Sequence, residues 1–175
     1  TTVAATDPDV GQTPVYSISG GADLARFTIN SSTGALSFIN APNFEAPTDA
    51  NTDNVYEVIV EASDGAITDT QTISVAVTDQ NEAPSITSSG GGATTLVSVS
   101  TNSTAVGTVT ASDPDAKTTL IYSISGGADL AQFSINSSTG ALSFINAPNF
   151  EAPTDANTDN VYKVIVQASD GTLTD

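Results

Sequence analysis

The 175-residue sequence contains no cysteine, no histidine and no tryptophan. The lack of cysteine excludes disulfides and thiolate metal sites, and the lack of histidine excludes imidazole acid–base pairs, histidine triads and histidine zinc sites. No apolar run reaches the roughly 18 residues that span a bilayer, so the sequence predicts no membrane insertion. Carboxylates, amides and hydroxyls therefore supply the polar chemistry of this chain.

Basic residues are also scarce. Arg26, Lys117 and Lys163 stand against 20 acidic residues, and the formal net charge is −17. Such a chain repels nucleic acid phosphates and anionic membrane surfaces, so neither is an expected partner. It also repels itself, and bound cations would relieve that repulsion.

The most informative feature that the sequence does contain is an internal repeat. Residues 6–69 match residues 112–175 without a gap at an offset of 106 positions, and only about a dozen positions differ. A complete repeat therefore needs about 106 residues, and the chain holds fewer than two. The first copy begins partway in, the second stops early, and residues 70–106 occur once.

Within each copy, short segments of alternating apolar and polar residues are separated by turn-forming residues, a pattern typical of strands. One such segment places Tyr56, Val58 and Val60 on one face and Glu57 and Glu61 on the other. Strands are predicted near residues 1–6, 14–19, 26–30, 35–39, 55–62, 70–78, 94–100, 105–111, 119–125, 132–136, 141–145 and 161–168. About seven short strands in about 100 residues predict an all-β fold of tandem immunoglobulin-like Greek-key β-sandwiches.

Counting strands divides the chain into two domains. Residues 1–83 are predicted to form a repeat that lacks its first strand, and residues 84–175 a repeat that lacks its last strand. The missing strands belong to flanking sequence or come from another chain by β-augmentation, and the sequence does not choose between these sources. Near-identical neighbouring repeats can also exchange strands.

A hairpin is expected in each copy, from Phe27 to Phe38 and from Phe133 to Phe144. In both, the loop reads Asn-Ser-Ser-Thr-Gly. This loop suits a type I turn followed by a glycine at positive φ.

The two domains are joined by a short acidic segment, residues 78–84, which we call the connector. It carries Asp79, Asn81 and Glu82 within four positions and ends in Pro84, which prevents the chain from simply continuing a central strand. Such a segment is either a hinge or a metal clasp.

Further acidic residues occupy loops that a sandwich brings to one end. Loops at alternate strand junctions gather at the same end, so we expect Asp113, Asp115 and Asp170 at the end of the second repeat that the connector approaches. Glu45 is expected where the connector leaves the first repeat. Asp, Asn, Pro and Gly are also the usual turn formers, so each motif alone needs no ligand. Taken together, these acids would surround one interdomain space. Ca²⁺, which takes six to eight oxygen ligands, would neutralise the repulsion between their carboxylates.

The predicted interdomain Ca²⁺ ligands are Glu45, Asp79, Asn81, Glu82, Asp113, Asp115 and Asp170. By the repeat, Asp7, Asp9 and Asp64 are predicted to bind Ca²⁺ at a junction with a preceding repeat, and Glu151 at a junction with a following repeat.

A separate local Ca²⁺ site is a further hypothesis for the loop at 49–54 and its copy at 155–160. Oxygen-bearing side chains at alternate positions copy the start of an EF-hand loop, but the later glycine and glutamate of that loop are missing. A plain turn is the simpler interpretation. The residues concerned are Asp49, Asn51, Asp53, Asp155, Asn157 and Asp159.

These motifs carry a family resemblance. The connector sequence Asp-Gln-Asn-Glu-Ala-Pro at 79–84 resembles the Asp-x-Asn-Asp-Asn-Ala-Pro linker of cadherin repeats. Asp-Pro-Asp at 113–115 resembles their Asp-x-Asp motif, Ala-Ser-Asp-Gly at 168–171 the aspartate motif ending their sixth strand, and Phe-Glu at 44–45 the acidic pair of their Leu-Asp-Arg-Glu motif. The resemblance spans the whole chain and is closest to the cadherin-like repeats of large bacterial surface and biofilm proteins. It implies extracellular tandem sandwiches joined end to end by Ca²⁺.

Three positions depart from the cadherin pattern. Asn43 stands where an aspartate is usual, Glu82 replaces an aspartate, and Thr101 occupies the position where the first strand normally offers a glutamate. Fewer charges imply fewer or weaker ions than at an animal cadherin junction.

The sequence thus leads to the hypothesis of a calcium-binding structural and adhesion repeat, a spacer in a long cell-surface array whose junctions Ca²⁺ makes rigid. Its partners would be neighbouring repeats of the same protein. The alternatives are a glycan- or protein-binding module, or a filament subunit completed by self-association and strand exchange with another chain. An enzyme is not expected, because the acids recur at loop positions in both copies, which suits a repeated structural ion better than one active site.

Overall fold

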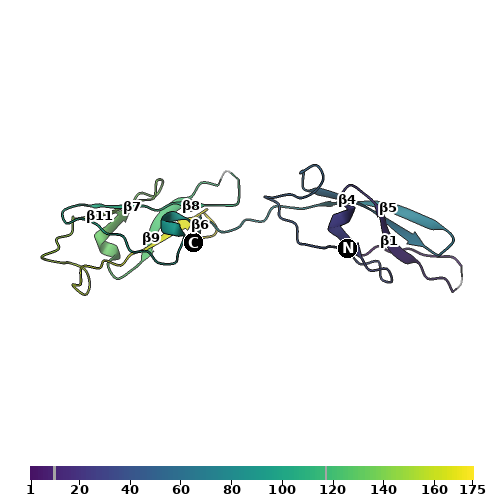
Figure 1. Cartoon of the computed structure of the whole chain (residues 1–175), viewed down its shortest axis with the longest axis horizontal. Coiled ribbons are helices and arrows are strands. Elements are labelled where there is room, and N and C mark those ends of the chain that lie inside the picture. Colours follow the sequence, from purple (N-terminus) through teal and green to yellow (C-terminus); the bar gives the residue numbers. More distant parts are fainter. Residues whose placement is uncertain (10, 117) are drawn as a thin grey trace. The chain divides into compact units, whose positions relative to one another are not determined.

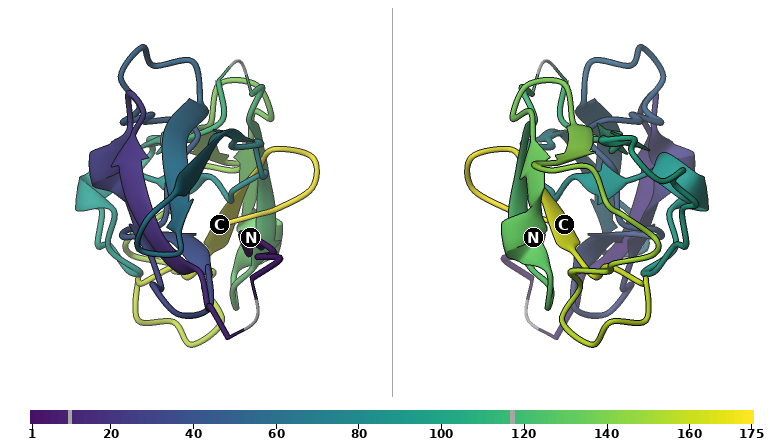
Figure 2. Two further views of the ribbon diagram at one scale, coloured as in Figure 1. Left: turned by 90° about the vertical axis from the view of Figure 1, so that its right-hand side faces the viewer. Right: turned by 90° about the vertical axis from the view of Figure 1, so that its left-hand side faces the viewer.

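The computed structural model describes residues 1–9, 11–116 and 118–175. The chain divides into two compact units, Thr1–Gln80, called unit 1, and Asn81–Asp175, called unit 2. Each unit consists of strands, loops and three-residue 3-10 helices (Figure 1 and Figure 2). The prediction of an all-β fold is confirmed.

Unit 1 is built around one long strand pair. Its elements are β1 (Val15–Gly20), η1 (Leu24–Arg26), β2 (Phe27–Ile29), β3 (Leu36–Phe38), β4 (Val55–Ser63) and β5 (Thr68–Ala76). Strands β1, β4 and β5 form an antiparallel sheet in the order β1-β4-β5, and β2 pairs with β3. Because side chains alternate along β4, Tyr56, Val58 and Val60 are at most 1% exposed, while Glu57 is exposed. These three side chains form one core with Val3, Tyr16, Phe27 and Leu36.

Unit 2 repeats part of this arrangement in shorter pieces. Its elements are β6 (Ser85–Ile86), η2 (Ser88–Gly90), β7 (Ala105–Thr108), β8 (Ala111–Ser112), β9 (Ile121–Gly126), η3 (Leu130–Gln132), β10 (Phe133–Ile135), β11 (Ala141–Phe144) and β12 (Ile165–Ser169). They pair as a sheet in the order β10-β11-β7 and as the pairs β12-β9 and β6-β8, all antiparallel. Phe133, Leu142 and Phe144 form the buried cluster of unit 2, and Val109 and Ala168 are buried as well.

Both hairpins form as predicted. Strand β2 pairs with β3, and β10 pairs with β11, in matching registers. Gly34 and Gly140 close the two loops at φ of 69° and 70°. A Cβ at Gly34 would lie 2.1 Å from the carbonyl oxygen of Val3, so only glycine fits at this position.

Several predicted strands differ from the structure. Residues 94–100 form no strand, and near the start of unit 1 only Thr2 makes an isolated bridge, to Ala35. The short pair β6-β8 was not predicted. Strand β12 begins at Ile165 rather than at residue 161. The physical reason is a difference in neighbours: β4 pairs with strands on both sides, whereas among the described residues β12 pairs with one strand, β9, and otherwise makes only an isolated bridge from Ser169 to Thr174.

Candidate metal centre

Three aspartates of unit 2 that are predicted calcium ligands lie close together. Asp113 and Asp115 follow β8, and Asp170 follows β12. One carboxylate oxygen from each lies within 4.8 Å of the other two, and all three residues are half-buried. Like charges at this distance repel one another, and the repulsion is stronger where water is partly excluded.

Two oxygen atoms in this cluster are buried without a partner. The N–H of Asp115 donates to Asp113 Oδ1 at 2.9 Å, so the Asp-Pro-Asp turn occupies one oxygen of Asp113. Asp113 Oδ2 and Asp115 Oδ1 are buried and accept no hydrogen bond from the described residues. A buried unpaired acceptor costs about 1–3 kcal/mol, and more when it is charged. The cluster therefore has the chemistry of a cation site, with oxygen ligands only.

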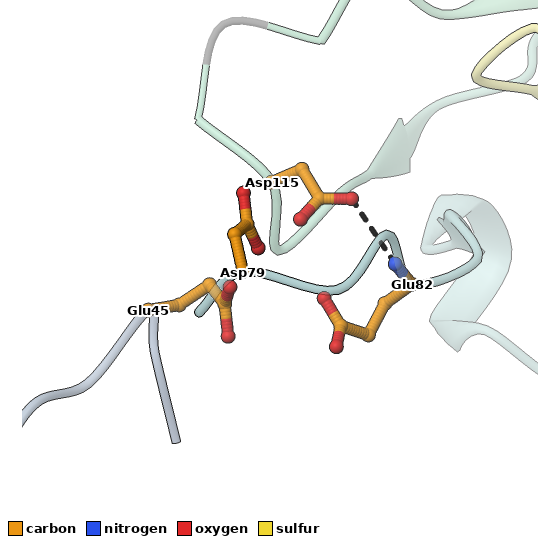
Figure 3. A group of neighbouring side chains, drawn as sticks. All are labelled: Glu45, Asp79, Glu82 and Asp115. Carbon is orange, nitrogen blue, oxygen red and sulfur yellow. Dashed lines mark hydrogen bonds between the residues drawn. The ribbon is translucent and has the colours of Figure 1, made fainter. Parts of the chain in front are cut away.

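The first residues of unit 2 lie against the same cluster. Glu82 N–H donates to Asp115 Oδ2 at 3.1 Å, as Figure 3 shows, and one carboxylate oxygen of Glu82 lies within 4.8 Å of one of Asp115. Asn81 Nδ2 donates to Asp170 Oδ2 at 2.7 Å and to the carbonyl oxygen of Glu82 at 3.2 Å. The connector residues Asn81 and Glu82 thus contact two of the three aspartates, and their role as calcium ligands stays a prediction.

Hydrogen bonds hold Asp170 as a carboxylate. The Asn81 amide, followed by the backbone N–H groups of Leu173 and Thr172, lowers the pKa of Asp170 below its ordinary value. These backbone groups donate to Asp170 Oδ1 at 2.6 and 2.5 Å. Asp170 therefore stays negative under mildly acidic conditions.

Unit 1 carries a second, smaller acidic group. One carboxylate oxygen of Glu45 lies within 4.8 Å of one of Asp79, and both residues are exposed. Figure 3 shows both residues. The backbone N–H of Glu45 donates to Asn43 Oδ1 at 2.9 Å, and this hydrogen bond closes the turn at residues 43–45. The asparagine that replaces the usual aspartate thus serves as the acceptor that shapes this turn.

The residues predicted for outer junctions lie in turns of the same type. Asp9 N–H donates to Asp7 Oδ1 at 2.7 Å, and Glu151 N–H donates to Asn149 Oδ1 at 3.0 Å. The backbone N–H groups of Ile67 and, to a lesser extent, Ala66 lower the pKa of Asp64. In the part of the chain that the structure describes, no group of three carboxylates within 4.8 Å includes any of these acids. Their role at junctions stays a prediction.

The two EF-hand-like loops use their carboxylates for their own backbone. Asp49 is only 4% exposed, and its oxygens accept the N–H groups of Asp53 at 2.9 Å and Asn54 at 3.3 Å. Asp53 accepts Val55 N–H at 2.8 Å and the Asn51 amide at 2.9 Å. The copy in unit 2 has the same bonds, made by Asp155, Asn157, Asp159, Asn160 and Val161. These contacts give both loops a structural role, and the local calcium site stays a prediction.

One pair of structural aspartates was missed from the sequence. Asp23 and its copy Asp129 are each 5% exposed. The two oxygens of Asp23 accept N–H groups from Ala50 and Glu57, both at 2.7 Å, so the carboxylate ties three segments together. The available signal was Gly-Gly-Ala-Asp directly after a predicted strand in both copies.

Comparison with known proteins identifies the fold. No protein-family model matches the chain. Human Protocadherin Fat 4 is 31% identical over 179 residues, a match that covers 99% of this chain and 3% of that protein. The crystal structure of human protocadherin-24 EC1-2 superposes with a TM-score of 0.59 at 20% identity, covering 96% of this chain and 75% of that one. The chain has a cadherin-like fold. Drosophila N-cadherin EC1-4 agrees, with a TM-score of 0.57 at 17% identity over 91% of this chain and 38% of that one.

The cadherin-like fold confirms the predicted tandem immunoglobulin-like sandwiches. A shorter match connects the chain to Halomucin of Haloquadratum walsbyi, with 51% identity over 35 residues, which is 20% of this chain. The chain spans only a small percentage of the length of the curated relatives it matches. Among the described residues, no helix is long and apolar enough to cross a membrane.

Proposed function

We propose that this cadherin-like chain is a calcium-binding extracellular structural and adhesion repeat, a spacer in a long array whose interdomain junctions Ca²⁺ makes rigid. The observation that supports this proposal most directly is a pair of buried oxygens, Asp113 Oδ2 and Asp115 Oδ1, that lie beside Asp170 and accept no hydrogen bond from the described residues. A bound cation would give these atoms a partner and offset the repulsion between the carboxylates.

The donor set favours Ca²⁺ over other metals. The chain lacks cysteine and histidine, so only oxygen ligands are available. Ca²⁺ takes six to eight oxygens in flexible geometry, whereas Mg²⁺ requires a tighter octahedron and keeps its waters. In this proposal Asp113, Asp115 and Asp170 hold the ion, and the half-buried Glu82 adds a further carboxylate. When bound, the ion supplies the positive charge that this end of the unit lacks.

The ion is proposed to join the two units as well. Asp79 belongs to unit 1 and Asn81 to unit 2, yet one residue separates them. Because consecutive Cα atoms are about 3.8 Å apart, Asp79 stays within roughly 8 Å of Asn81 in any arrangement of the units. Asp79 thus stays near the first residue of unit 2, and in this proposal it binds the ion together with its neighbour Glu45. The compact units divide at 80/81, and we place the boundary between the sequence repeats at 83/84.

Rigidity would follow from linkage. An ion that binds only the assembled junction stabilises it in proportion to ln(1 + [Ca²⁺]/Kd). Extracellular calcium modules have Kd values of about 10⁻⁴ to 10⁻³ M, so millimolar calcium would keep the junction mostly filled. Without the ion, the acids of the two units repel each other and the connector acts as a hinge.

The same reasoning extends to the rest of the parent protein. Asp7, Asp9 and Asp64 would bind Ca²⁺ with a preceding repeat, and Glu151 with a following one. The partners are then neighbouring repeats, the location is the cell surface, and no enzymatic activity is needed. An origin in a microbial surface or biofilm protein rests on the resemblance and on the short Halomucin match.

Core packing of the aromatic rings favours a spacer over a glycan-binding module. In unit 1, Phe27 stacks on Phe38 with ring centroids 4.6 Å apart, and Tyr56 meets Phe38 edge-on at 5.1 Å. Sugar recognition commonly uses exposed rings, and these three rings are committed to the core; of the phenylalanines, Phe150 is the one that is largely exposed, at 65%.

Calcium titration calorimetry tests the proposal. The chain is expected to bind Ca²⁺ with a Kd of about 10⁻⁴ to 10⁻³ M, and Asp115→Asn is expected to weaken binding about tenfold or more. The control is Glu57→Gln, an exposed carboxylate of unit 1 outside every predicted calcium site, which should leave this affinity unchanged. The absence of binding heat at about 10 mM Ca²⁺, well above that Kd range, would contradict the proposal.

A further inference from the structure

We infer that Asn54 is a positioning residue for the calcium ligands of unit 1, and that the loop at 49–54 serves as a brace for Glu45 and Asp79. The inference rests on the proposed function, because it assumes that these two carboxylates bind Ca²⁺. It assigns the loop a role in metal binding without making any loop residue a ligand.

Asn54 connects the two segments that carry the acids. Its side-chain Nδ2 donates to the carbonyl oxygen of Phe44 at 2.9 Å, directly before Glu45. Its backbone carbonyl accepts the N–H of Val77 at 2.9 Å, two residues before Asp79. One residue thus fixes the start of both acidic segments, whose carboxylate oxygens lie within 4.8 Å of each other.

The loop holds Asn54 in the conformation that this contact requires. Asn54 has a φ of 64°, in the left-handed region that asparagine and glycine adopt most readily. The buried carboxylate of Asp49 accepts the N–H groups of Asp53 and Asn54 and so closes the turn. The chain from Asp49 to Asn54 therefore forms a closed unit with one amide pointing toward Phe44.

The asparagine brings one unfavourable feature to the loop. Its Oδ1 is buried and has no hydrogen-bond partner among the described residues. Glycine would adopt the same φ and would remove this unpaired atom. What glycine could not supply is the bond to Phe44, which holds the turn before Glu45.

Unit 2 provides a matched control within the chain. Asn160 has a φ of 62°, and its Nδ2 donates to the Phe150 carbonyl oxygen at 3.2 Å, in front of Glu151. Because Glu151 lies in no group of three carboxylates among the described residues, the same change there should not affect the calcium site of this chain.

The experiment compares Asn54→Gly with Asn160→Gly in the full chain. Ca²⁺ affinity is measured by calorimetry, and amide hydrogen exchange is measured at Glu45 without calcium. Removal of a group that orients a metal ligand typically weakens binding about 10- to 100-fold, so we expect Asn54→Gly to lose about tenfold in affinity. Asn160→Gly should bind as the unchanged chain does. Exchange at Glu45 should become faster only in Asn54→Gly.

Three results separate the possible failures. If the unchanged chain binds Ca²⁺ and Asn54→Gly binds equally well, the inference is wrong and the proposed function stands. If both glycine variants weaken binding equally, Asn54 acts through general stability and the positioning role is also wrong. If the unchanged chain binds no Ca²⁺, the proposed function and the inference fail together.

Discussion

The two copies of the repeat have almost the same sequence and different strand partners. In unit 1, β4 runs from Val55 to Ser63 and pairs with β1 and β5. In unit 2, the matching strand β12 runs only from Ile165 to Ser169 and pairs with β9. Much else is shared, including the stacked rings of the two hairpins, 4.6 and 4.5 Å apart.

The difference shows that neighbouring strands decide burial as much as a strand's own sequence does. Tyr56, Val58 and Val60 are at most 1% exposed in unit 1. Their copies in unit 2, at positions 162, 164 and 166, are only half-buried. Local structure such as the hairpin forms in both units, whereas the long strand and the full burial of these three side chains occur in the unit that has β5; Ala168, at 0% exposed, is buried in unit 2 without it.

The largest expected change in stability comes from giving unit 2 a strand equivalent to β5. The sequence of residues 70–77, Thr-Gln-Thr-Ile-Ser-Val-Ala-Val, would be appended after Asp175. Ala168 and Asp175 already exchange both backbone hydrogen bonds, at 2.8 and 3.0 Å, as a first step of that pairing. We expect β12 to lengthen and the unfolding free energy of unit 2 to rise by about 2–4 kcal/mol, from apolar burial less chain ordering.

Denaturant unfolding and hydrogen exchange at residues 161–168 would measure the gain. A control extension with prolines in place of the isoleucine and valines cannot pair and should add nothing. Equal protection in both extended chains would mean that strand pairing does not explain the difference between the units.

A smaller change in unfolding free energy is expected from valine-to-alanine substitutions at matched positions of the two units. Val58→Ala removes two methyl groups from a fully buried site in unit 1 and should cost about 2 kcal/mol. Val164→Ala changes a half-buried site in unit 2 and should cost about half as much or less. Hydrogen exchange in β4 and in β9 reports each cost separately. Equal losses would show that the two cores are equally packed.

The smallest expected effect is a change in the pKa of one aspartate and not of its copy in the other unit. Asp64 and Asp170 occupy matched turns, but only Asp170 accepts the Asn81 amide. Asn81→Ala should raise the pKa of Asp170 and leave that of Asp64 unchanged, as followed by NMR titration of the carboxyl carbons. If the pKa of Asp170 stays where it was, the Asn81 bond does not contribute to it.

The sign of the pH dependence follows from the lowered pKa. A folded-state pKa below the unfolded value stabilises the fold above about pH 3.9, and this contribution is lost as pH falls through the folded pKa. Asn81→Ala should therefore reduce stability near neutral pH and have little effect in strong acid.

Sequence reasoning reached those features that local chemistry determines. The alternation that buries Tyr56, the glycine of each hairpin and the convergence of Asp113, Asp115 and Asp170 all follow from periodicity, turn chemistry and sandwich topology. Side-chain contacts between segments that are distant in the sequence could not be predicted from it. The recurring Gly-Gly-Ala-Asp segment singles out Asp23, but it does not identify Ala50 and Glu57 as the residues whose N–H groups Asp23 accepts.

The length of each strand also could not be predicted from the sequence, because it depends on the neighbouring strand, as the two copies illustrate. Residues 94–100 alternate as a strand should, yet they have no strand partner and Leu96 is 83% exposed. The pair β6-β8 is only two residues long in each strand, too short for any periodic signal. Alternation predicts which face is buried once a partner exists, and it does not predict the partner.

The central proposal is that calcium turns the connector from a hinge into a clasp. Small-angle X-ray scattering of the full chain tests it directly, at millimolar calcium and after chelation, with Asp115→Asn as the variant that should not respond. We expect calcium to narrow the distribution of interatomic distances of the unchanged chain and to leave that of Asp115→Asn broad. Identical scattering profiles of the unchanged chain with calcium and with chelator would contradict the proposal.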